Sequence, residues 1–110
     1  MICNAANVLR ELFDHSQATL SDDKLEWLDN LSACAELEAG NLAKTLEALA
    51  LFFANSDKSS LPGNETVASI LWGLSHQAET ISAMVSIGQE AEYLAGKRKA
   101  ERTKTDNNPA

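Results

Sequence analysis

Few residues in this chain combine the chemical type and the spacing that catalysis or metal binding requires. His15 and His76 lie far apart, and neither belongs to an HxxxH or ExxH unit that would present metal ligands on a helix. Glu36 and Glu38 are two positions apart, which places them on different sides of a helix. Cys34 lies among Ala and Leu residues without a neighbouring base, which is typical of a packed thiol. No GxSxG, P-loop or GxGxxG motif occurs either, so we expect no catalytic residue, no metal, no cofactor and a protein that is not an enzyme.

His76 is the residue for which a functional comparison can be made. The size of the chain and the helical run from His76 to Thr80 are similar to histidine phosphotransfer domains, and this resemblance implies phosphoryl transfer to an imidazole. Such domains usually carry a lysine three residues after the histidine, together with a nearby glycine. Here that position holds Glu79, whose charge opposes an incoming phosphoryl group, and Gly88 is further along than the pattern places it. Phosphotransfer is therefore kept only as a minor alternative.

Charge is unevenly distributed along the chain, which has a net charge of −7. Residues 1–96 hold four basic and fourteen acidic side chains, whereas residues 97–110 hold five basic and two acidic ones. An acidic body of this kind repels nucleic-acid phosphates, so we do not expect direct nucleic-acid binding. We interpret residues 97–110 as a basic and polar flexible tail whose charges suit the end of the preceding helix. Contact of that tail with a phosphate backbone is the alternative.

The two cysteines and the apolar runs indicate a cellular compartment. Cys3 and Cys34 do not form a CxxC unit, and the first residues lack the charged and apolar regions of a secretory signal. Free thiols are typical of a reducing compartment, so we expect a cytoplasmic protein. The longest apolar run, Ala48 to Ala54, is much shorter than the roughly 18 residues that a membrane span needs, and we expect no membrane contact.

Apolar residues recur at helical spacing in three segments, which predict helices over about 4–15, 21–55 and 64–96. Turn formers at 55–63 separate the two long segments, which we expect to form a long antiparallel αα-hairpin. The fold class is therefore all-α, with a short N-terminal helix followed by the hairpin. A single helical domain is expected to span residues 1–96.

Several residues mark the ends of these segments. Asn4, Ser21 and Asn64 can each cap a first helical turn. Gly96, followed by basic residues, is a plausible end for the last helix. Gly40 lies inside the second segment, where it either permits a close approach or a slight bend, or splits the segment into two helices.

Both long segments carry more apolar surface than a hairpin needs. Each has a 3-4 stripe for packing against the other, and these stripes include Leu46 and Leu71. Further apolar residues lie beside or opposite the stripes, and the short first helix is too small to cover them. We therefore predict a homodimer in which two chains form a helical bundle. The candidate interface residues, for a second copy or another protein, are Leu31, Leu49, Phe52, Phe53, Trp72, His76, Ile81 and Ile87.

The function predicted from these patterns is a small, acidic, non-enzymatic interaction protein. In size, charge and helical character it is similar to accessory proteins of phages and mobile elements. An alternative is an inhibitor or antitoxin-like protein that binds a host enzyme or a nucleic-acid-binding protein through its acidic face. That face would comprise Asp22, Glu26, Asp29 and Glu36, which could instead be the solvated side of a helix.

Overall fold

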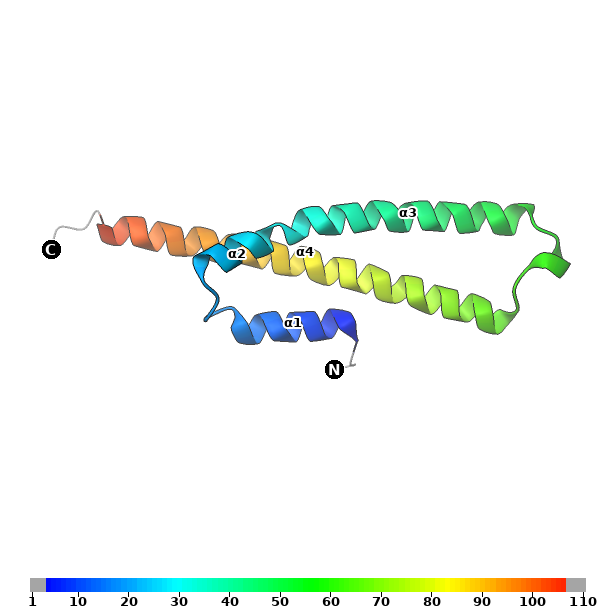
Figure 1. Cartoon of the computed structure of the whole chain (residues 1–110), viewed down its shortest axis with the longest axis horizontal. Coiled ribbons are helices and arrows are strands. Elements are labelled where there is room, and N and C mark those ends of the chain that lie inside the picture. The colour runs from blue at the N-terminus through cyan, green and yellow to red at the C-terminus, as the bar shows by residue number, and fades with distance from the viewer. Residues whose placement is uncertain (1–3, 107–110) are drawn as a thin grey trace.

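The computed structural model describes residues 4–106, and its regular elements over this range are helices, so the predicted all-α class is confirmed (Figure 1). The elements in chain order are α1 (Ala5–Ser16), α2 (Asp22–Asp29), α3 (Leu31–Asn55), the 3-10 turn η1 (Lys58–Ser60) and α4 (Asn64–Asp106). The chain turns back at η1, so that α3 and α4 run in opposite directions.

The helices form a thin, elongated molecule around α4. In Figure 1, α3 lies along one side of α4, α1 lies along the other, and α2 crosses α4. The extents are 79 × 26 × 14 Å, and the shortest of them is only slightly more than the diameter of one helix, about 10–12 Å. The radius of gyration is 20.4 Å, whereas a compact chain of this length has about 13 Å. The fold is therefore close to a single layer of helices.

Side-chain caps fix the beginnings of α1 and α2 where the sequence predicts them. The backbone N–H of Asn7 donates to the Asn4 side chain at 2.9 Å, and that of Lys24 donates to the Ser21 hydroxyl at 3.2 Å. Both caps satisfy N–H groups that the first turn of a helix leaves without partners.

The predicted single helix over 21–55 is wrong, because the chain breaks at Asn30. The backbone N–H of Asn30 donates to the carbonyl of Trp27, three residues back, at 3.2 Å. This tight turn interrupts the α-helical ladder and separates the direction of α2 from that of α3. Gly40 lies within the unbroken α3, so a split at Gly40 is also wrong.

The predicted helix end at Gly96 is wrong as well, because α4 continues to Asp106. No described residue has a positive φ, so Gly96 does not adopt the left-handed conformation of a helix cap. A glycine inside a helix costs about 1 kcal/mol, and the following Lys, Arg, Ala and Glu residues are good helix formers that offset this cost. Of the predicted flexible tail, residues 97–106 are helical, and residues 107–110 lie outside the described residues.

A small core lies where α1 and α2 meet α4. Its buried residues are Phe13, Leu25, Ile87 and Ala91. Leu20, which precedes the Ser21 cap, also packs against this cluster. The packing holds α1 and α2 against α4 from about its middle onward, where Arg10 of α1 donates to the Ser82 side chain at 3.3 Å. The earlier turns of α4 have only α3 beside them.

At Gly88 the backbone of α4 lies close to the beginning of α3. A Cβ atom at Gly88 would lie 2.6 Å from the Ser32 Oγ and 3.0 Å from the Ser32 backbone nitrogen. At Gly96, by contrast, a Cβ atom would have no neighbour within 4 Å. Gly88 is therefore required by packing, whereas Gly96 is not.

We expect opposite effects when these two glycines are replaced by alanine. Gly88→Ala forces α3 and α4 apart, at a cost of about 1–3 kcal/mol that exceeds the gain in helix propensity. Gly96→Ala stabilises the protein by about 0.5–1 kcal/mol, because residue 96 lies inside a helix and has free space around it. Urea denaturation followed by circular dichroism measures both changes, and stabilisation by Gly88→Ala would contradict the close crossing.

Candidate interaction surface

The half of the molecule that contains the chain reversal lacks buried residues. We call residues 36–82 the arm; it comprises α3 after Ala35, the connection with η1, and α4 as far as Ser82. The structure describes every residue of the arm, and none of them is buried. The buried side chains of the described chain all lie outside it, in α1, α2, the first turns of α3 and α4 from Ala83 onward.

Large apolar side chains on the arm face solvent. Their exposed fractions range from 37% for Phe53 to 66% for Leu37 and Trp72. The full set is Leu37, Leu46, Leu51, Phe52, Phe53, Leu71 and Trp72. Scattered exposed apolar residues are ordinary on a protein surface, whereas these seven lie together on two adjacent helices and make the arm the candidate interaction surface.

The apolar residues of α3 surround the helix instead of forming one stripe. Ala48 to Ala54 is an unbroken apolar run of about two turns, so it presents apolar side chains in every direction. Within this run only Leu49 is half-buried, and the other residues are exposed. A helix that is apolar all round is normally buried among other helices. The end of α3 is therefore apolar on every side and exposed on most of them.

The structure divides the predicted interface residues into three groups. Ile87 is buried and Leu31 packs against the same cluster, so both serve the core of their own chain instead of a partner surface. Leu49 and Ile81 are half-buried. The four that are exposed, and available to a partner, are Phe52, Phe53, Trp72 and His76.

Leu46 and Leu71 are exposed although their spacing places them in the stripes between the helices. Their exposed fractions are 47% and 60%. The reason is that α3 and α4 diverge toward the connecting loop, as Figure 1 shows, so residues near that end are covered less by the opposite helix. The helical spacing placed both leucines in the stripes of α3 and α4 that are expected to pack against each other, but it could not show how far apart the two helices lie.

His76 lies on the exposed side of α4 beside Trp72. The centres of the two rings are 6.1 Å apart and the planes are tilted by 43°. Glu79, three positions later, accepts a hydrogen bond from the Asn4 side chain at 3.0 Å. No Lys or Arg occurs between residues 59 and 96, so this part of α4 offers no cation to a phosphoryl group.

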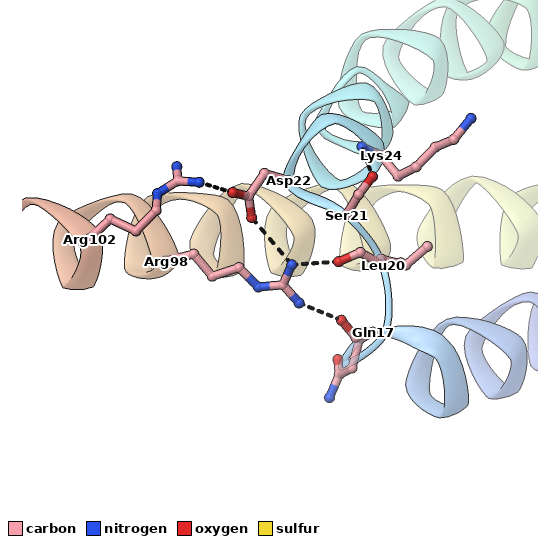
Figure 2. Close-up of polar contacts among 7 residues, drawn as sticks. All are labelled: Gln17, Leu20, Ser21, Asp22, Lys24, Arg98 and Arg102. Carbon is pink, nitrogen blue, oxygen red and sulfur yellow. Dashed lines mark hydrogen bonds and ion pairs between the residues drawn. The ribbon is translucent and has the colours of Figure 1, made fainter.

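Two arginines near the end of α4 hold the connection between α1 and α2 (Figure 2). The guanidinium of Arg98 donates to the carbonyls of Gln17, at 2.9 Å, and Leu20, and to the Asp22 carboxylate at 3.3 Å. Arg102 also donates to Asp22. The two carbonyls follow the end of α1, where a helix leaves acceptors without intrahelical partners. These two basic side chains therefore support the fold, and they are not free charges on a tail.

Comparisons with known proteins give no further assignment. No protein-family model, no curated protein and no solved structure matches this chain. Within residues 4–106, no helix is both long enough and apolar enough to cross a bilayer. The same residues contain no group of three or more His, Cys, Asp or Glu side chains placed to hold a metal ion.

We expect Arg98→Ala to destabilise the protein by about 1.5–3 kcal/mol, since hydrogen bonds from a charged donor to two carbonyls and a carboxylate are lost. Arg98→Lys should restore little of this loss, because an ammonium group cannot reproduce the forked geometry of a guanidinium. Lys99→Ala is the matched control: this side chain is exposed, so the change should stay within about 0.5 kcal/mol. Equal urea midpoints for the two alanine variants would contradict the structural role of Arg98.

Proposed function

We propose that this chain is a cytoplasmic, non-enzymatic interaction protein that forms a homodimer through the arm. The observation that carries the proposal is that residues 36–82 contain no buried residue and expose seven large apolar side chains. A two-helix arm of this kind has little interior, and helices in water depend mainly on tertiary packing for their stability. A second copy supplies that packing.

The surface area of the chain supports this proposal. Its accessible surface is 8144 Å², whereas a compact monomer of 11.9 kDa exposes about 6,000 Å². The excess is roughly 2,100 Å² per chain. Obligate homodimers bury about 2,000–5,000 Å² in total, or about 1,000–2,500 Å² on each partner. The excess surface is therefore of the size that one tightly bound copy covers.

Sedimentation equilibrium at micromolar concentration tests the proposal directly. We expect a mass about twice that of the 11.9 kDa chain, and an unfolding midpoint that rises with protein concentration because dissociation accompanies unfolding. A stable, well-folded monomer at these concentrations would contradict the proposal.

Two substitutions probe the arm in the same assay. Leu49→Asp and Ile81→Asp each place a charge at a half-buried position of the arm, and we expect both to favour the monomer and to lower stability by more than 1 kcal/mol. Ala18→Asp is the control, because Ala18 is exposed in the turn between α1 and α2, outside the arm. A dimer that survives both arm substitutions would exclude this surface.

A further inference from the structure

The arm is a pair of helices with two flat faces, one on each side of the line where α3 meets α4. Half-buried or buried residues seven positions apart mark this line: Ala35, Leu42 and Leu49 on α3, and Val67, Leu74 and Ile81 on α4. Successive residues turn a helix by about 100°, so the positions beside this line fall on one face or the other. The two faces can therefore be compared residue by residue.

The direction of the helices decides which residues share a face. Leu46 lies four positions after Leu42, and Leu71 lies four positions after Val67. Because α3 and α4 run in opposite directions, positions displaced in this same sense lie on the same side of the pair. We name this side the Leu46 face, and it includes Ala43, Leu46, Ala50, Phe53, Leu71 and Ser75. The opposite side is the Asn41 face, which includes Asn41, Thr45, Ala48, Ser69, Gly73 and Thr80.

The two faces differ in chemistry. The Leu46 face carries three large exposed apolar side chains, Leu46, Phe53 and Leu71, and the residues between them are mostly alanine. The Asn41 face carries amide and hydroxyl groups instead. Phe52 also lies toward the Asn41 face, and its ring is edge-on to that of Phe53 with centres 5.6 Å apart. Burial of the Leu46 face removes more apolar surface from water than burial of the Asn41 face. On the Asn41 face, the Thr45 and Thr80 hydroxyls already donate to the carbonyls of Asn41 and His76, so the polar difference between the faces rests mainly on the Asn41 amide.

The shape of the molecule also distinguishes the two faces. Leu25 of α2 packs against Ile87 and Ala91 of α4. Ile87 lies seven positions after Thr80, so α2 sits on the same side of α4 as the Asn41 face. In Figure 1, α2 is the helix that crosses α4. A second arm laid on the Asn41 face would extend toward α2. On the other side, α1 lies alongside α4 without crossing it, and its Arg10 donates to Ser82, seven positions after Ser75 of the Leu46 face.

We propose that the second copy docks on the Leu46 face, so that the two arms stack face to face as a four-helix bundle. This inference rests on the proposed homodimer and specifies which surface forms it. Given 1.5 Å per residue and two helix diameters, the face measures about 30 Å by about 20 Å, or about 600 Å². This is the lower end of the roughly 600–1,000 Å² that a standard interface buries on one partner. Alanines allow the two layers to approach closely, and Leu46, Phe53 and Leu71 project between them. A two-fold axis makes the contact self-complementary.

A matched pair of substitutions on α3 tests this assignment. Ala50 and Ala48 are two residues apart, both exposed, and lie on the Leu46 and Asn41 faces respectively. Ala50→Glu places a charge inside the proposed interface, and we expect it to weaken dimerisation at least tenfold in sedimentation equilibrium. Ala48→Glu makes the same chemical change on the opposite face and should leave the dimer intact. Circular dichroism checks that both variants remain helical.

A second pair repeats the comparison on α4. Ser75 and Ser69 are both exposed, and Ser75→Glu should weaken the dimer whereas Ser69→Glu should not. A wild-type chain that is monomeric would overturn the homodimer and this inference together. A wild-type dimer that is weakened by Ala48→Glu and Ser69→Glu, but not by Ala50→Glu and Ser75→Glu, would keep the homodimer and overturn the choice of face. A dimer unaffected by all four variants would place the interface elsewhere on the arm.

Discussion

The close crossing of α3 and α4 at Gly88 is the contact on which the arrangement of the other helices depends. The absence of a side chain at Gly88 lets the Ser32 backbone approach α4, and this sets the level at which α3 begins to follow α4. Beside this contact, Ile87 and Ala91 of α4 pack with Leu25 and Phe13 and form the core. Toward the connecting loop, α1 accompanies α4 as far as Ser82, and beyond that level α3 and α4 continue without another helix and diverge (Figure 1). One contact thus separates a packed body from an uncovered arm.

Local signals in the sequence were sufficient for the beginnings of α1 and α2 but not for the break that begins α3, and Asn64, predicted as a cap, is the first residue of α4. Asn4 and Ser21 cap their helices as predicted, because a cap depends on a few adjacent residues. The break at Asn30 depends on where α2 must lie to bury Leu25, which is a tertiary requirement. Gly96 resembled a helix end by its residue type alone, but the helix continues and Arg98 and Arg102 beyond it contact the α1–α2 connection.

The candidate surface could be predicted only in part, because α4 has different neighbours along its length. A single stripe fits its first turns, where α3 is the neighbouring helix, but from Glu79 onward α4 also contacts Asn4 and α1, and further along it packs against α2. Ile87 therefore falls off the stripe and yet is buried. Conversely, Leu46 and Leu71 fall on the stripes and yet are exposed. This could not be predicted, because the spacing of residues along one helix carries no information about the distance between two helices. The sequence alone indicated that the long helices have more apolar residues than their mutual packing needs, but only the structure showed which of these residues are exposed.

The contacts between Arg98 and the α1–α2 connection have a consequence for the order in which the chain acquires its structure during synthesis. The Arg98 guanidinium and the carbonyl that it binds on Gln17 are 81 positions apart in the sequence. The core partners of α1 and α2 likewise lie in the second half of α4. While the ribosome is still producing the arm, the first two helices have no surface to pack against. Phe13 and Leu25 therefore stay exposed until nearly the whole chain has been made. Forming these long-range contacts then costs the chain conformational entropy, which slows folding.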